Sequence, residues 1–82
     1  MTDELRAARK KIDALDRRLA ALLGRRFALA APLAGLKKKV SDPARERQVL
    51  ANARGHAGGK IYAAGVTAVF KEIIKQSKRL QR

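Results

Sequence analysis

The fold of this chain is decided by residues 5–36, which read LRAARKKIDALDRRLAALLGRRFALAAPLAGL. Apolar residues recur in this stretch at steps of three and four, as they do on one face of an α-helix. This apolar stripe consists of Leu5, Ala8, Ile12, Leu15, Leu19, Leu22, Leu29, Leu33 and Leu36. Arg26 occupies the position that would continue the stripe between Leu22 and Leu29. The pattern therefore predicts a long amphipathic helix with a charged residue on its apolar face.

Arg26 is the residue of this helix that packing explains least. A charge that is buried without a partner is strongly unfavourable. No acidic residue lies within one helical turn of Arg26 in the sequence. We therefore expect its partner to come from outside the helix, and a small anionic ligand is a serious candidate.

The first helix is predicted over about residues 3–39. Pro32 removes one backbone hydrogen bond and predicts a kink near residues 28–32, but the leucine stripe keeps its phase across the proline. A helix of this length is about 55 Å long, whereas a compact domain of this size has a radius of gyration of about 12 Å. The helix must project beyond its own fold, so its stripe needs another chain and a homodimer is expected.

Two shorter helices are predicted after the first. Asp42 can cap a helix whose first residue is Pro43, and this second helix covers about residues 43–53. Three glycines within residues 55–59 mark a loop. A third helix covers about residues 61–81, and no segment has the pattern of a strand. The expected fold class is all-α, with three helices per chain in a single domain over residues 1–82.

Composition restricts the class of protein. The core must be built from Leu, Ile, Val and Ala, because the chain has only two Phe, one Tyr and no Trp. No cysteine is present, which excludes disulfides, and one histidine without cysteine excludes the usual structural zinc sites. No segment is apolar enough to span a bilayer and the N-terminus does not resemble a signal peptide, so a cytoplasmic location is expected.

The net charge of +13 is high and needs an explanation. The chain has 20 Lys and Arg residues against 7 Asp and Glu, and the basic residues are scattered along its whole length. Such an excess is compatible with a solvated surface, with nucleic-acid binding and with binding of anionic small molecules.

Several further polar residues lie where an amphipathic helix does not require them. Lys37 follows Arg26 by eleven residues, which returns it to nearly the same helix face about 16 Å further along. Two cations so placed can lean toward each other and clamp a small dianion. On the second helix Asp42, Arg45 and Glu46 share a face.

The third helix adds Ser77, which continues an apolar stripe, and Gln81 one turn beyond it. Simpler explanations exist for the other candidates. Asp42 can be only a helix cap, and Arg45–Glu46 can be a surface pair. Lys37 can simply favour the negative end of the helix dipole.

Taken together and in order, these residues resemble the all-helical chorismate mutases. The resemblance covers essentially the whole chain, with matching spacing. It is carried by residues 8–16, residues 22–26, Lys37, residues 42–46, residues 73–77 and Gln81.

The resemblance implies an intertwined homodimer with antiparallel long helices and two equivalent active sites. The site residues that it implies are Arg9, Arg26, Lys37, Asp42, Arg45, Glu46, Ser77 and Gln81. Arg9 is expected to reach in from the partner chain. The sequence supports this point independently, because Arg9 and Arg26 are about 25 Å apart along one helix, too far to grip one small ligand.

The implied reaction is the conversion of chorismate to prephenate. This intramolecular Claisen rearrangement needs no proton transfer, nucleophile, metal or cofactor. The enzyme holds a dicarboxylate in its compact conformer and stabilises negative charge on the ether oxygen. Arginines suit carboxylates, so Arg9 and Arg26 take the two anionic ends. By the same resemblance, Lys37 and Gln81 donate to the ether oxygen.

The remaining roles also follow from the resemblance. Glu46 and Asp42 accept from the ring hydroxyl, Ser77 assists a carboxylate, and Arg45 orders the acidic side chains. The residues expected to act in catalysis are therefore Arg9, Arg26, Lys37, Glu46 and Gln81.

Three alternatives remain open. The first is elimination of pyruvate from isochorismate on the same scaffold. The presence of Asp42, Glu46 and Ser77 favours the mutase over this lyase. The second is a basic helical dimer that binds nucleic acid, although nothing matches a helix-turn-helix or an aromatic stacking platform. The third is a regulatory or scaffolding module that is fused to, or bound by, another enzyme of the shikimate pathway.

Overall fold

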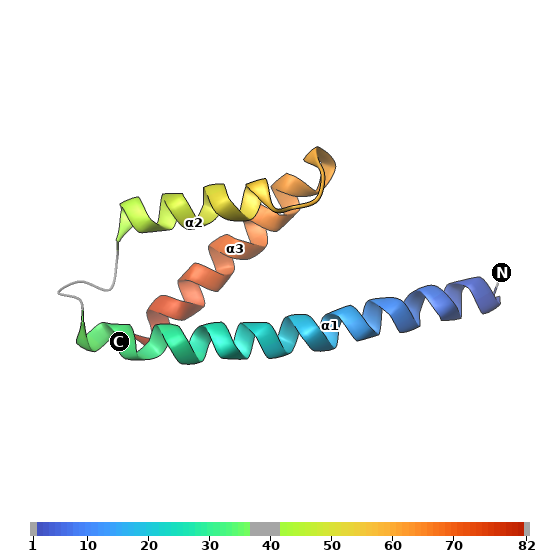
Figure 1. Ribbon diagram of the computed structural model, residues 1–82, viewed down its shortest axis with the longest axis horizontal. Coiled ribbons are helices and arrows are strands. Elements are labelled where there is room, and N and C mark those ends of the chain that lie inside the picture. Colours follow the sequence, from blue (N-terminus) through green and yellow to red (C-terminus); the bar gives the residue numbers. More distant parts are fainter. Residues whose placement is uncertain (1, 37–41, 82) are drawn as a thin grey trace.

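The computed structural model describes residues 2–36 and 42–81, and these residues are helical apart from short connections (Figure 1). The elements are α1 (Thr2–Ala30), the 3₁₀-helix η1 (Ala31–Gly35), α2 (Pro43–Gly55) and α3 (Lys60–Leu80). No strand occurs within the described ranges. The structure therefore confirms an all-α chain with three helices, of which the first is long.

The first helical run differs from its prediction near Pro32. The α-helical geometry ends at Ala30, and the chain continues as η1 only to Gly35. Pro32 stands at the start of η1 and has no N–H for an α-type bond, so the chain tightens into a 3₁₀ turn. The disturbance expected near residues 28–32 is thus a change from α- to 3₁₀-helix rather than a kink within a continuous α-helix. Residues 37–39 lie outside the described residues.

The second helix begins as the sequence predicts. Asp42 caps it, because its side-chain oxygen Oδ1 accepts a hydrogen bond from the backbone N–H of Arg45 at 3.2 Å. Pro43 follows at the first helical position, where its missing N–H costs nothing. The helix ends at Gly55, two residues later than expected, and α3 begins and ends within one residue of its prediction.

Gly58 makes the tight connection between α2 and α3. It is the glycine with a positive φ, 87°, among the described residues. We expect Gly58→Ala to lower the free energy of unfolding by about 1 kcal/mol, because a Cβ disfavours this backbone conformation. Thermal or urea unfolding measures the change. Gly55→Ala is the control, since Gly55 ends a helix, has open space around it and should lose no stability; equal losses in both variants would contradict the prediction.

The small core lies where α3 packs on α2 and crosses the C-terminal end of α1 (Figure 1). The buried apolar residues are Ala53, Ala63 and Ile73, and Ser77 is the buried polar residue. In contrast, α1 has no buried residue. Because α3 crosses the C-terminal end of α1, the end of α3 lies beside the junction of α1 and η1.

The apolar stripe of α1 lies on the surface of the single chain. Leu5, Ile12, Leu15, Leu19 and Leu22 are each between 50% and 56% exposed. The chain measures 55 Å along its longest axis, and the N-terminal half of α1 extends away from α3 (Figure 1). One chain by itself thus leaves a row of large apolar side chains uncovered.

Candidate active site

A pocket of about 250 Å³ lies where the end of α1, η1, the start of α2 and the end of α3 meet. We call it the Arg26 pocket. It is lined by Arg26, Leu29, Ala30, Leu33, Asp42, Arg45, Glu46, Val49, Ile74, Ser77, Lys78 and Gln81. Six of the eight site residues expected from the sequence are therefore brought together on one chain. The apolar members supply the walls between them.

Arg26 points from the stripe of α1 toward α3, where it meets Ser77. Its Nη1 donates to the hydroxyl Oγ of Ser77 at 2.9 Å. That hydroxyl donates in turn to the carbonyl oxygen of Ile73 at 2.8 Å, so its only proton is already used. Ser77 is 6% exposed and holds the guanidinium firmly in place. The partner sought outside the first helix is thus a neutral group, and the positive charge of Arg26 is not neutralised by it.

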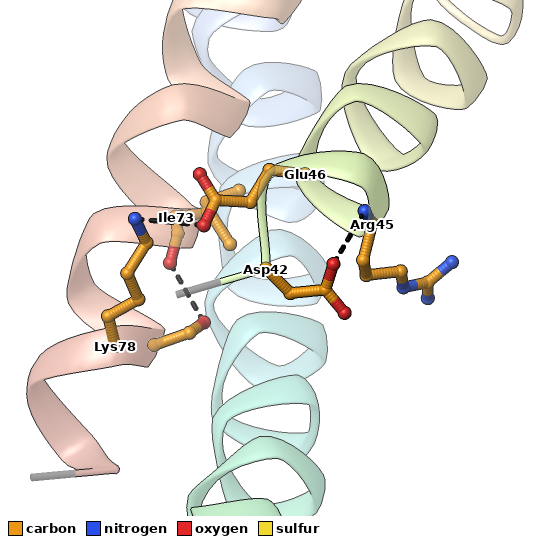
Figure 2. A network of polar contacts seen from close by, with 6 residues as sticks. Asp42, Arg45, Glu46, Ile73 and Lys78 are labelled. Atoms are coloured by element: carbon orange, nitrogen blue, oxygen red, sulfur yellow. Dashed lines mark hydrogen bonds and ion pairs between the residues drawn. The ribbon is translucent and has the colours of Figure 1, made fainter. Parts of the chain in front are cut away.

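The two acidic residues of the pocket lie at the start of α2, and each has a partner other than Arg26 (Figure 2). Asp42 accepts from the backbone N–H of Arg45, as the helix cap requires. Glu46 forms an ion pair through Oε2 with Nζ of Lys78 at 2.8 Å. Both carboxylates therefore sit at the pocket without contacting Arg26.

The resemblance implied that Arg45 orders the acidic side chains of the site, but its guanidinium contacts neither of them. Its Nη1 donates to Oε1 of Gln48 at 2.7 Å, and the group points away from Glu46 in Figure 2. The contact between Arg45 and Asp42 is made by the backbone N–H. In this structure Arg45 thus orders Asp42 through its main chain rather than through its charge.

Gln81 joins the end of α3 to the junction of α1 and η1. Its Nε2 donates to the carbonyl oxygen of Ala30 at 3.0 Å. Its Oε1 is buried and has no hydrogen-bond partner within the described residues. Such an acceptor is unfavourable by about 1–3 kcal/mol until a donor reaches it. One N–H of the amide is therefore engaged with the fold, and the unpaired atom is an acceptor.

The two other expected site residues are Lys37 and Arg9. Lys37 lies outside the described residues. Arg9 lies near the N-terminal end of α1, where it lines a separate surface hollow together with residues such as Leu5 and Asp13. A single chain does not bring Arg9 to Arg26.

Lys78 is the charged residue of the pocket that the sequence analysis did not single out. It lines the pocket from α3 and pairs with Glu46 on α2. Its position directly after Ser77 carries no local signal, because several other lysines and arginines of α3 have the same character. Only the packing of α2 on α3 distinguishes it from them.

No group of three or more His, Cys, Asp or Glu side chains in the described ranges is placed to hold a metal ion. Among the helices within residues 2–36 and 42–81, none combines the length and the apolar character needed to cross a membrane.

The fold and the pocket together define an all-helical protein whose cationic pocket suits a small organic anion. The sequence pattern of the family described as chorismate mutase type II matches residues 8–82, which include every expected site residue. The chain belongs to this family. Comparisons with curated proteins and with solved structures found no match.

Proposed function

We propose that this protein is a chorismate mutase, an isomerase that converts chorismate to prephenate. The observation that carries the proposal is the half-buried guanidinium of Arg26, which is fixed by a neutral hydroxyl and keeps its charge for a ligand. Membership of the chorismate mutase type II family supports it.

The reaction requires no covalent bond between the protein and the substrate. The ether C–O bond breaks as a new C–C bond forms within the same molecule, so that no atom enters or leaves. Catalysis therefore rests on holding the compact conformer and on stabilising the charge that develops at the ether oxygen. In our proposal Arg26 grips one carboxylate, assisted by Ser77, and Glu46 and Asp42 accept from the ring hydroxyl.

The ether oxygen requires hydrogen-bond donors that stabilise its developing charge. We propose Lys37 and Gln81 for this role. Gln81 lines the pocket, and its amide has a second N–H besides the one bonded to Ala30. Its buried Oε1 awaits a donor, which a bound ligand or a second chain can supply.

The site needs a second chain to be complete. An antiparallel partner helix would cover the exposed leucines of α1 and bring its own Arg9 to Arg26. On a single helix these two arginines are about 25 Å apart. We therefore propose a homodimer with two equivalent sites, each using Arg9 of the other chain. The second guanidinium then holds the second carboxylate of the substrate.

The function is tested by incubating the purified protein with chorismate. We expect the absorbance of chorismate to fall while prephenate accumulates, and prephenate is identified by chromatography and mass spectrometry. The same protein is given isochorismate, from which pyruvate release would indicate the lyase. Binding of DNA with a steep salt dependence and no turnover of either compound would instead favour nucleic-acid recognition.

A further inference from the structure

Lys78 is a charged residue of the Arg26 pocket to which the proposed reaction assigns no task. Its ammonium group reaches from α3 to the Glu46 carboxylate on α2 (Figure 2). The two side chains are 27% and 28% exposed. Within residues 2–36 and 42–81 this is the only contact between a Lys or Arg side chain and a carboxylate that is close enough to be a salt bridge. In so basic a chain, the pairing of this one lysine with a pocket carboxylate calls for a reason.

The reason lies in how the charges of the pocket are partnered. The guanidinium of Arg26 bonds to the hydroxyl of Ser77, and that of Arg45 bonds to the amide oxygen of Gln48. Both partners are neutral. Each guanidinium therefore keeps a full positive charge that is available to an incoming anion.

The carboxylates are partnered in the complementary way. Asp42 is occupied by a backbone N–H, and Glu46 is occupied by Lys78. Lys78 contacts Oε2 of Glu46, so that Oε1 stays able to accept from a ligand hydroxyl. Without this ion pair, the Glu46 carboxylate would be free to bond to Arg26, because a guanidinium binds a carboxylate strongly through two parallel hydrogen bonds.

We propose that Lys78 is a positioning residue that holds Glu46 away from Arg26 and thereby leaves Arg26 free for the substrate carboxylate. This inference deepens the proposed function and rests on it. Loss of Lys78 does more than remove one positive charge. It releases a carboxylate inside the pocket that competes with the dianionic substrate for the same guanidinium.

The test compares Lys78→Met with Lys75→Met in the full chain. Lys75 lies one turn earlier on α3, is exposed and does not line the Arg26 pocket, so its replacement removes the same charge elsewhere. We expect Lys78→Met to raise KM for chorismate about tenfold while kcat changes less than about threefold. Lys78→Arg should stay near wild type, because it restores the ion pair.

A second replacement separates this role from a merely structural one. If the freed Glu46 carboxylate is the competitor, adding Glu46→Gln to Lys78→Met should lower KM again. The glutamine keeps an oxygen that can accept from the substrate hydroxyl, but it carries no negative charge to compete for Arg26. A lysine that only supports the fold would give a double variant at least as impaired as Lys78→Met. That result, or equal KM values for Lys78→Met and Lys75→Met, would overturn the inference.

Binding measurements distinguish failure of this inference from failure of the proposed function. Calorimetric titration with prephenate, a dicarboxylate that does not react further, should give the same order of affinities among the variants. If wild type fails to convert chorismate but the order holds, the proposed reaction fails and the role of Lys78 stands. If wild type converts chorismate and the order is absent, only the role of Lys78 fails.

Discussion

Arg26→Ala is expected to lower kcat/KM for chorismate by about a thousandfold, which corresponds to about 4 kcal/mol of lost transition-state stabilisation. The loss is large because Arg26 is a half-buried cation fixed by Ser77, and its own partner is uncharged. Initial rates of chorismate loss over a range of concentrations measure it. Since Ser77 keeps its bond to Ile73, the variant should remain helical by circular dichroism.

Arg25→Ala is the matched control for this experiment. Arg25 is the neighbouring residue of α1, has the same side chain and is exposed to solvent. Its replacement removes the same charge from the chain without touching the pocket. We expect kcat/KM to change less than about threefold. Similar losses in both variants would mean that overall charge, rather than the position of Arg26 on the apolar stripe, governs activity.

Mixing two inactive variants is expected to restore activity. Arg9→Ala and Arg26→Ala each disable every site in their own homodimers. When equal amounts are unfolded and refolded together, half of the dimers contain one chain of each kind, and one of their two sites is intact. The mixture should therefore recover about one quarter of wild-type activity, because the two sites of a symmetric dimer are equivalent. Chorismate turnover before and after mixing measures the gain.

A mixture of Arg26→Ala and Glu46→Ala provides the control. Both residues line the pocket from the same chain, so no exchange of chains rebuilds an intact site. This mixture should stay inactive. If it recovered as much activity as the Arg9→Ala mixture, or if neither mixture recovered, the sharing of Arg9 between chains would be contradicted.

The helices could be predicted closely where local chemistry decides them. Asp42 followed by Pro43 predicts where α2 begins, because a cap and a proline act on the residues next to them. The end of the first helix was harder to predict. Pro32 indicated a disturbance, but whether the chain kinks and continues or changes to a 3₁₀ turn depends on the bonds that the junction finds. Gln81, whose side chain reaches Ala30, is part of that environment.

Which polar residues gather at the Arg26 pocket was also largely visible in the sequence, whereas their hydrogen bonds were not. The resemblance selected Arg26, Ser77 and Gln81 because motif and spacing are properties of the sequence. It did not reveal that Gln81 has an N–H bonded to Ala30, or that the guanidinium of Arg45 faces Gln48. Hydrogen-bond partners depend on side-chain directions, which are set only once the helices have packed.

By itself, the sequence determined the helical class, the starts of α2 and α3, and an arginine on an apolar stripe that needs an outside partner. These features depend on spacing over one or two helical turns, which the chain carries locally. The tertiary structure alone decided that Ser77 holds Arg26 and that Lys78 holds Glu46. Arg26 and Ser77 are 51 residues apart, and they meet because α3 crosses the end of α1. The angle of that crossing comes from the packing of whole helix faces, which no local pattern encodes.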